Sequence, residues 1–394
     1  MNGTIYMPVG EVCSSISDTY REKKNMVTLI NTSDVLEGRV LNHERVPNSN
    51  LKGQFKKTFQ RDDILYSEIR PQNRRFAYVD FSPIDYIAST KLMVIRAKKD
   101  VVSPKYLYYF LKNSSTVAEL QLLAETRSGT FPQITFSEVA NLTIPVPSLA
   151  VQEVIVQTMQ CLEDKITCNE QINDNLEQQA QAIYHERFET VSPNDLPSEW
   201  RIVTLGEVAT ISNKSFNPLK EPEILLEHYS IPAFDEARFP VFELSTSIKS
   251  NKFIIDASCF MISKLNPTTK RVWKPYCLTG NAVCSTEFIV YKAKDKTITD
   301  FLYSVIDSNS FSDFMCSHVT GSTGSRQRTT PSDTLSYELI LPSEDELAEF
   351  QSLVSPMYAQ IRINAIENDR LKRLRDSLLP KLMSGEIDVS AVQF

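Results

Sequence analysis

The chain has 394 residues, a length that suits two domains of ordinary size better than one small module. Hydrophobic residues make up 42% of it and charged residues 23%, so the chain can bury cores and is not disordered. Its formal net charge of −7, from 42 basic and 49 acidic side chains, at first argues against a nucleic-acid-binding protein.

The N-terminal segment and the cysteines indicate the compartment. Residues 1–12 lack the basic and apolar regions of a secretory signal, and no apolar run approaches the ~20 residues of a membrane span. The 7 cysteines form no CxxC pair, and the 4 histidines are not at metal-ligand spacing. We therefore expect a soluble cytoplasmic protein with no metal site and no membrane partner, whose cysteines are small core residues.

The first region of the chain mixes strand and helix signals. Residues 86–97 (YIASTKLMVIRA) alternate roughly in polarity, which predicts a strand, and residues 102–113 begin with Ser-Pro and predict a helix. Two prolines in residues 142–148 (LTIPVPS) permit an extended chain but not a helix. The region 1–148 is therefore predicted to be an α/β or α+β domain with a mostly antiparallel or mixed sheet.

Residues 149–190 predict one long helix. From Ile155 the apolar positions recur at spacings of four and three, and this heptad seam includes Ile166, Asn169, Asn173 and Leu176. An asparagine in such a seam restricts the register because it is satisfied only opposite another polar group. Residues 191–200 (VSPNDLPSEW) contain two prolines and are predicted to end the helix as a linker.

The rest of the chain repeats this plan. At an offset of 196, ILYSEIRPQNRR (64–75) falls on FMISKLNPTTKR (260–271), and after one deletion the offset is 195. Because the register drifts by so little, we interpret the match as a domain duplication and not as a chance likeness between two unrelated domains. The second domain is predicted over 201–343, with an internal helix capped by Thr299 or Asp300, followed by a second long helix over 344–387 and a tail over 388–394.

The second long helix carries a matching seam, which includes Ile361, Asn364, Asn368 and Leu371. We expect the two helices to form an antiparallel coiled coil, because the chain must return across a globular domain between them. The alternative is that each helix packs on its own domain. Pro356 and Pro380 would each kink the second helix or mark an end.

The net charge is distributed unevenly among the predicted segments. The net charge is +4 over residues 1–148, −7 over 149–196, −1 over 197–343 and −3 over 344–394. The excess acidity therefore lies in the helices, and the globular regions are near neutral to basic.

Basic and hydroxyl side chains gather at matching turns of the two units. Such side chains suit DNA because hydroxyls bond phosphates, while Arg and Gln pair with guanine and adenine edges. Any single one is more simply a solvated surface charge, but their recurrence favours DNA contact. The candidates are Arg70, Arg74, Arg75, Arg127, Ser128 and Thr130 in the first unit, and Lys264, Lys270, Arg271, Ser325, Arg326, Gln327 and Arg328 in the second.

The sequence lacks the common motifs of catalysis and nucleotide binding. GxGxxG, GxxxxGK[ST], GxSxG and HExxH do not occur, and Asn266-Pro267 is followed by two threonines in place of the Pro-aromatic pair of amino-group DNA methyltransferases. Asp62, Asp63 and Glu68 could imitate a nuclease carboxylate cluster, but the second unit does not mirror them. We expect no catalytic residues.

Three segments in each unit, taken in their order along the chain, resemble the DNA-specificity subunit of type I restriction–modification systems. The resemblance extends over essentially the whole length of the chain. In the first unit the resemblance is carried by DILYSEIRP (63–71), SGTFPQITFSEVANLTIPVP (128–147) and DKITCNEQINDNLEQQAQAIYHERF (164–188). In the second unit it is carried by WRIVTLGE (200–207), LILPSEDELAEF (339–350) and LRDSLLPKLMSGEI (374–387).

The resemblance implies a non-catalytic recognition subunit with two target-recognition domains. Each domain would read one half of a bipartite, asymmetric site in double-stranded DNA, and the helix pair would set the spacer and dock two methylation subunits. Restriction subunits would complete the complex, with S-adenosylmethionine, ATP and Mg²⁺ on the partner subunits and no cofactor on this chain. The turns TGSTGSRQRTT (320–330) and SGTFPQI (128–134) differ, so the two halves are expected to read different sequences. The alternatives are a self-contained methyltransferase or nuclease, and a coiled-coil scaffold protein.

Overall fold

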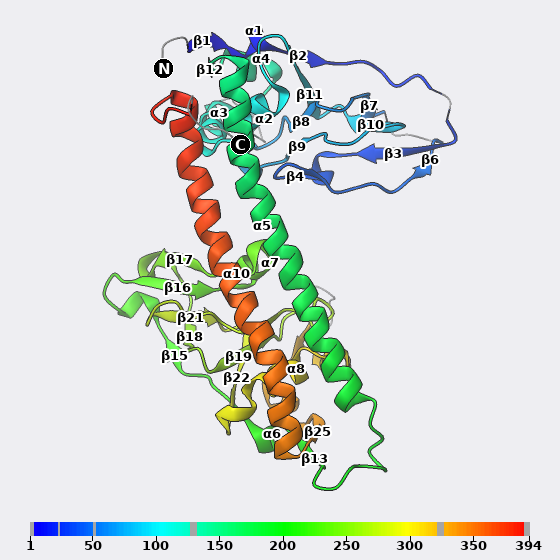
Figure 1. The fold of residues 1–394 in the computed structure, drawn as a ribbon, viewed down its shortest axis with the longest axis vertical. Helices are drawn as coiled ribbons and strands as arrows, with labels where there is room; N and C mark the ends of the chain where they lie inside the picture. Colours follow the sequence, from blue (N-terminus) through cyan, green and yellow to red (C-terminus); the bar gives the residue numbers. More distant parts are fainter. Residues whose placement is uncertain (1–3, 23, 50–52, 127–131, 321–326, 390–394) are drawn as a thin grey trace. The chain divides into compact units, whose positions relative to one another are not determined.

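Figure 1 shows the computed structural model of the chain, which describes residues 4–22, 24–49, 53–126, 132–320 and 327–389. The chain forms two compact units, the first made of residues 1–165 with 371–394 and the second of residues 166–370. Both boundaries fall inside long helices, so each unit contains one end of α5 (Leu149–Tyr184) and one end of α10 (Glu344–Ser384). Within the described part of the chain, no helix is long and apolar enough to cross a membrane.

Two four-stranded sheets form the centre of the first unit. One is antiparallel, with the order β2-β11-β8-β9 (Cys13–Ile16, Leu92–Ala97, Ile64–Ser67 and Phe76–Tyr78). The other is mixed, with the order β6-β3-β10-β7 (Val46–Pro47, Met26–Ile30, Tyr86–Ser89 and Phe55–Lys57), in which β3 and β10 are parallel. Two further antiparallel pairs are β1 with β12 (Ile5–Pro8 and Thr143–Val146) and β4 with β5 (Val35–Leu36 and Arg39–Val40).

Strand β11 separates two hydrophobic cores, because successive side chains of a strand point to opposite faces. Met93 and Ile95 lie in the core that the antiparallel sheet shares with the helices. Leu92 and Val94 lie in the smaller core with Ile30 and residues of the other sheet. With both faces buried, the first four residues of the strand (92–95) are all apolar and show little of the alternation typical of a half-exposed strand.

Four short helices cover the first unit: α1 (Val9–Val12), α2 (Pro104–Lys112), α3 (Ser114–Thr126) and α4 (Phe136–Asn141). The buried Gln152 fixes the beginning of α5 to α2, since its Oε1 accepts from the Ser103 backbone N–H at 2.8 Å and its Nε2 donates to the Pro147 carbonyl at 2.8 Å. Helix α5 therefore starts in one orientation on the domain that precedes it.

The second unit repeats the two-sheet plan, as the sequence duplication predicts. Its antiparallel sheet has the order β14-β22-β19-β20 (Ala209–Ile211, Phe288–Ala293, Cys259–Ser263 and Val272–Trp273). Its mixed sheet has the order β15-β18-β21-β16-β17 (Ser215–Phe216, Lys252–Ile254, Ala282–Ser285, Leu225–Tyr229 and Val241–Leu244), and the parallel pair β16–β21 matches β3–β10. The second unit also contains the strand pairs β13–β25 and β23–β24 (Arg201–Thr204, Glu338–Leu341, Val319–Thr320 and Arg328–Thr329), and helices α6, α7, α8 and α9 (Leu205–Val208, Ile231–Ala237, Thr299–Ile306 and Asn309–Ser317).

Local expectations need correction at several places. Residues 86–97 form two strands, β10 and β11, which turn at Thr90-Lys91 and belong to different sheets. Helix α8 has Ile298 as its N-cap, because a short 3₁₀ turn (Lys296–Ile298) capped by Asp295 leads into it. Helix α10 runs through both Pro356 and Pro380, so neither proline ends it. Cys161 and Cys168 are exposed and are not core residues.

The long helices pack both on each other and on the globular parts. In the first unit, Ile155 and Met159 of α5 share a core with Leu379 and Leu382 of α10. In the second unit, Ala180 and Tyr184 of α5 share a core with Val354 and Tyr358 of α10. The helices therefore pack on each other, as the predicted coiled coil requires, and they also pack on the globular parts, as the alternative proposed.

In the second unit the polar seam positions confirm an antiparallel pairing. Asn169 bonds Asn368, and Asn173 bonds Asn364, so the residue number rises on one helix as it falls on the other. Of the apolar seam positions, Ile166 and Ile361 are buried and Leu176 is partly buried. Leu371 is partly buried and belongs to the first unit.

Candidate nucleic-acid interface

The turn after β8 in the first unit is tied to two distant segments through its backbone. The Glu68 N–H donates to the Lys91 carbonyl at 3.0 Å, and the Glu68 carbonyl accepts from the Ile134 N–H at 2.8 Å. The Arg70 N–H donates to the Pro132 carbonyl at 3.1 Å. Inside the turn, the Ser67 hydroxyl oxygen accepts from the Ile69 N–H at 3.0 Å.

The turn after β19 in the second unit has the same framework. The Lys264 N–H donates to the Glu287 carbonyl at 2.9 Å, and the Lys264 carbonyl accepts from the Thr329 N–H at 3.1 Å. The Asn266 N–H donates to the Gln327 carbonyl at 2.9 Å. Ser263 plays the part of Ser67, since its hydroxyl oxygen accepts from the Leu265 N–H at 3.2 Å. The duplication therefore preserves how three separate segments meet at this place.

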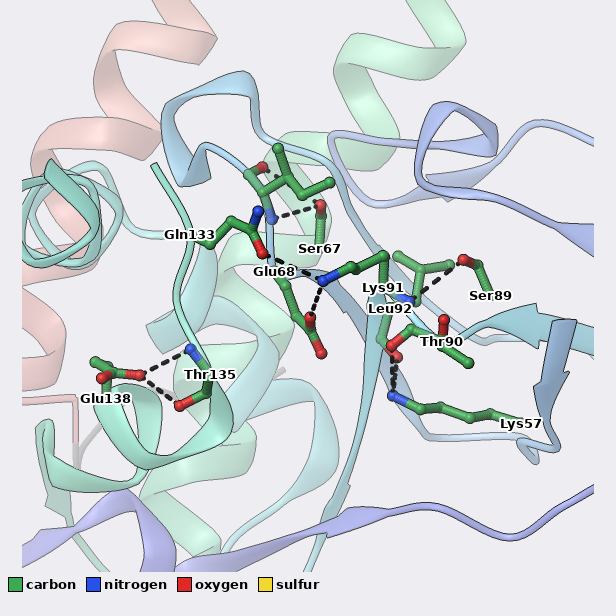
Figure 2. A network of polar contacts seen from close by, with 11 residues as sticks. Lys57, Ser67, Glu68, Ser89, Thr90, Lys91, Leu92, Gln133, Thr135 and Glu138 are labelled. Atoms are coloured by element: carbon green, nitrogen blue, oxygen red, sulfur yellow. Dashed lines mark hydrogen bonds and ion pairs between the residues drawn. The ribbon is translucent and has the colours of Figure 1, made fainter. Parts of the chain in front are cut away.

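Polar side chains of the first unit converge on this framework, as Figure 2 shows. The Lys91 ammonium lies between the Glu68 carboxylate, at 3.5 Å, and Oε1 of Gln133, at 3.2 Å. Lys57 lies close by and donates to the carbonyls of Thr90 and Leu92 at 3.0 and 2.8 Å. Burial lowers the pKa of the Lys57 ammonium, and its two carbonyl partners make it a brace for the turn between β10 and β11.

The same place in the second unit carries different side chains. Arg328 donates from Nε and Nη2 to the two carboxylate oxygens of Glu287, at 2.9 and 3.1 Å. The hydrogen bond to Glu287 raises the pKa of the Arg328 guanidinium, which stays charged. Position 68 is acidic where position 264 is basic, and position 91 is basic where position 287 is acidic. The backbone is shared, but the charges at two of its positions are exchanged.

The structure places the predicted residues of the first unit around this turn. Arg70 is exposed and has a left-handed backbone, with φ of 44°. Arg74 donates to the Ser114 hydroxyl at 2.9 Å, and Arg75 donates to the Ser33 carbonyl at 3.0 Å. The last two arginines therefore hold the fold together as well as adding positive charge. Arg127, Ser128 and Thr130 lie outside the described residues.

In the second unit the predicted residues have separate surroundings. Lys270 pairs with Asp307 at 3.0 Å, and Arg271 pairs with both oxygens of Asp235 at 2.6 and 2.9 Å. Lys264, Gln327 and Arg328 lie together at the turn through the backbone bonds given above. Ser325 and Arg326 lie outside the described residues.

The three acidic residues that could imitate a nuclease site have separate cationic partners. Asp63 is buried and bonds Arg96 through both oxygens at 2.7 and 2.8 Å, while Asp62 bonds Lys99 at 2.7 Å and Glu68 bonds Lys91. Across the described ranges, no group of three or more His, Cys, Asp or Glu side chains is placed to hold a metal ion.

Sequence reasoning missed Lys91, Gln133 and Glu287, which take part in the two clusters. Gln133 and Lys91 are 42 positions apart in the chain, and neither stands in a basic run. One signal was available, because the alignment of the repeats at offsets of 196 and 195 places Lys91 on Glu287 and Gln133 on Arg328.

A family described as the type I restriction modification DNA specificity domain matches residues 6–178. The type I restriction enzyme HindI specificity subunit of Haemophilus influenzae is 28% identical over 449 aligned residues, which cover 92% of this chain and 94% of that protein. The type I restriction enzyme MjaIX specificity subunit of Methanocaldococcus jannaschii is 25% identical, over 78% of this chain and 76% of that protein.

A solved structure shares the fold. The crystal structure of the type I restriction–modification system S subunit from M. genitalium superposes with a TM-score of 0.54 at 15% identity, over 99% of this chain and 98% of that one. The fold places the chain in the class of tandem duplications, because a mixed α/β unit occurs twice and each copy contains one end of both long helices. The chain is similar to type I restriction–modification specificity subunits over most of its length.

Proposed function

We propose that this chain is the specificity subunit of a type I restriction–modification system, and that each of its units binds one half of a bipartite, asymmetric site in double-stranded DNA. The observation that carries the proposal is the repeated turn, in which one backbone framework presents Glu68, Lys91 and Gln133 in one unit and Lys264, Glu287 and Arg328 in the other. Sequence is read in DNA by side chains that reach base edges from a rigid support. One support with two side-chain sets gives two related domains with different targets.

The remaining basic residues of the turns have a different part in the proposal. Arg70 in the first unit and Lys270 in the second are exposed at the turn. Contacts of such residues with phosphates would add affinity that falls with salt but would carry no sequence information. The −7 charge of residues 149–196 suits a helix that stays off the duplex.

We assign the helix pair two tasks: setting the spacer between the half-sites and docking two methylation subunits. The support is that α5 and α10 each contribute residues to both units, so their length constrains where the units bind. Apolar side chains on these helices remain exposed, including Ile172 at 41% and Ile363 at 54%, as expected for a face that a protein partner covers. S-adenosylmethionine, ATP and Mg²⁺ would act on methylation and restriction subunits, and this chain would bring no cofactor.

Reconstitution tests this proposal against its alternatives. The purified chain is incubated with DNA and S-adenosylmethionine, with and without the methylation subunits, and binding is measured against salt. We expect sequence-dependent binding that survives added salt, and methylation that requires the partner subunits. Methylation by the chain alone would make it a self-contained enzyme. Binding that depends on salt but on no sequence would make it a scaffold.

A further inference from the structure

Positions 133 and 328 are equivalent by structure as well as by the repeat. Ile69 of the first turn forms an isolated bridge with Gln133, and Leu265 of the second turn forms the same bridge with Arg328. The residue that follows each position is buried, with Ile134 at 1% and Thr329 at 0% exposure. Each side chain therefore leaves a backbone anchored on one side by the core and on the other by the turn.

Both positions carry a planar group that can form two parallel hydrogen bonds. A glutamine amide has one donor and one acceptor, which match the N7 and N6 atoms of adenine in the major groove. An arginine guanidinium presents paired donors, which match O6 and N7 of guanine. The other two positions of the cluster instead exchange an acidic for a basic residue between units, so 133 and 328 are the pair at which both units hold a planar group that carries N–H donors.

We propose that Gln133 and Arg328 are the equivalent specificity-determining residues of the two units, Gln133 reading adenine in one half-site and Arg328 reading guanine in the other. The inference rests on the proposed function and deepens it. We also assign a role to the residues that contact these two side chains. Lys91 and Glu287 are positioning residues, which orient the Gln133 amide and the Arg328 guanidinium.

The contacts of Arg328 show how positioning works in the second unit. The Glu287 carboxylate offers two acceptor oxygens to one guanidinium, at 2.9 and 3.1 Å. Guanine offers O6 and N7 in a comparable side-by-side arrangement, so guanine can replace the carboxylate without reorienting the guanidinium plane. A base without two acceptors leaves Arg328 with Glu287, and this competition favours guanine.

The contacts of Gln133 show the corresponding arrangement in the first unit. Lys91 donates to Oε1 of Gln133 at 3.2 Å and holds the carbonyl in place. A carbonyl oxygen accepts two hydrogen bonds, so Oε1 can still accept from N6 of adenine while Nε2 donates to N7. Lys91 is itself held by Glu68 at 3.5 Å, so this set adds no net charge near the duplex.

The test exchanges the reading pair between units in the full chain with its methylation subunits. Arg328→Gln with Glu287→Lys gives the second unit the residues of the first, and Gln133→Arg with Lys91→Glu makes the reciprocal change. Specificity is measured by selection from randomised duplex DNA and by sequencing of methylated DNA. We expect a guanine of one half-site to become adenine in the first variant, and an adenine of the other half-site to become guanine in the second. Discrimination at that position should change by about 5- to 150-fold, and the other half-site should stay unchanged.

The matched control is Lys292→Gln, which removes the cation of another surface ion pair of the second unit, with Asp256 at 2.5 Å. It should leave the selected sequence unchanged. The inference is overturned if an exchanged variant selects the wild-type sequence, or if it binds all duplexes more weakly without a change of base. It is also overturned if the half-site of the second unit in the wild-type motif contains no G·C pair, a readout that needs no variant. Failure of the wild-type chain to select any bipartite sequence would instead count against the proposed function.

Discussion

The side-chain amide of Asn169 in α5 donates a 2.9 Å hydrogen bond to Oδ1 of Asn368 in α10, and both side chains are buried. Nδ2 of Asn368 in turn donates to the carbonyl of Ile166 at 3.3 Å. The repeat maps this contact onto its neighbour, in which Asn364 donates to Oδ1 of Asn173 at 2.8 Å. Two equivalent polar contacts therefore fix one antiparallel register of the helix pair in the second unit.

The Asn169–Asn368 contact predicts an asymmetry between single and double variants. Asn169→Leu leaves the buried Oδ1 of Asn368 without its donor, which should cost about 1–3 kcal/mol. Asn169→Leu with Asn368→Leu removes both amides and should recover part of that loss, because the Glu367 carboxylate, to which Asn169 also donates at 2.7 Å, stays in place. Thermal unfolding measures both variants, at about 2–4 °C per kcal/mol for a unit of this size. Gln171→Leu, at an exposed position of α5, is the control. A single variant as stable as the wild type would contradict the assigned contact.

Gly38 gives a second stability prediction. It lies in the turn between β4 and β5 with φ of 106°, and a Cβ added there would meet the Tyr108 hydroxyl at 2.2 Å. Gly38→Ala therefore combines backbone strain with a steric clash, and should destabilise the first unit by about 1–3 kcal/mol. Gly53→Ala is the matched control, because a Cβ there meets no atom within 4 Å. Equal melting temperatures for the two variants would show that the turn is wrongly described.

His228 predicts a pH dependence of the second unit. Its Nδ1 contacts Glu243 at 2.6 Å, and burial lowers the pKa of the imidazole below its ordinary value of 6.5. The unfolded chain therefore binds the proton more tightly than the folded chain, so stability should fall as the pH drops through about 6.5 toward the lowered pKa. Melting temperatures between pH 7.5 and 5.5 should fall less for His228→Gln than for the wild type. Parallel pH profiles of the two proteins would contradict this assignment.

The proposed role of the helix pair predicts a change of spacer. Seven residues inserted into each helix, after Lys165 and after Arg370, preserve the seam period and lengthen each helix by about 10 Å. At 3.4 Å per base pair, the unspecified spacer in the methylated sequence should grow by about three base pairs, with both half-sites unchanged. The same insertion in one helix alone cannot preserve both the asparagine contacts of the second unit and the helix packing of the first, and should abolish specific methylation. An unchanged spacer in the double insertion would refute the role assigned to the helices.

The fold was largely predictable because its signals are long or repeated. The matching seams predicted that the helices pair, since an asparagine inside an apolar seam has few places to find a partner. The antiparallel polarity was predicted from the return of the chain across the globular domain between the helices. The division of residues 86–97 into β10 and β11 was not predictable from alternation, because both faces of β11 are buried and the turn at Thr90-Lys91 carries neither Gly nor Pro.

The candidate site was predictable only in part. Runs of basic residues drew attention to Arg74 and Arg75, yet these side chains bond Ser114 and the Ser33 carbonyl within the fold. Lys91 and Gln133 are 42 residues apart in the chain and come into contact only in the folded protein. Local composition therefore cannot predict their contact. Arg328 was predicted, but its carboxylate partner Glu287 lies in another turn and was not.

Sequencing of the DNA methylated by this chain with its methylation subunits would show directly whether each unit reads its own half-site. We expect one asymmetric motif made of two specified halves, separated by a spacer of fixed length and free sequence. We also expect that Arg328→Gln with Glu287→Lys alters one half alone. A continuous motif, or a variant that alters both halves together, would contradict the claim that each unit reads its own half.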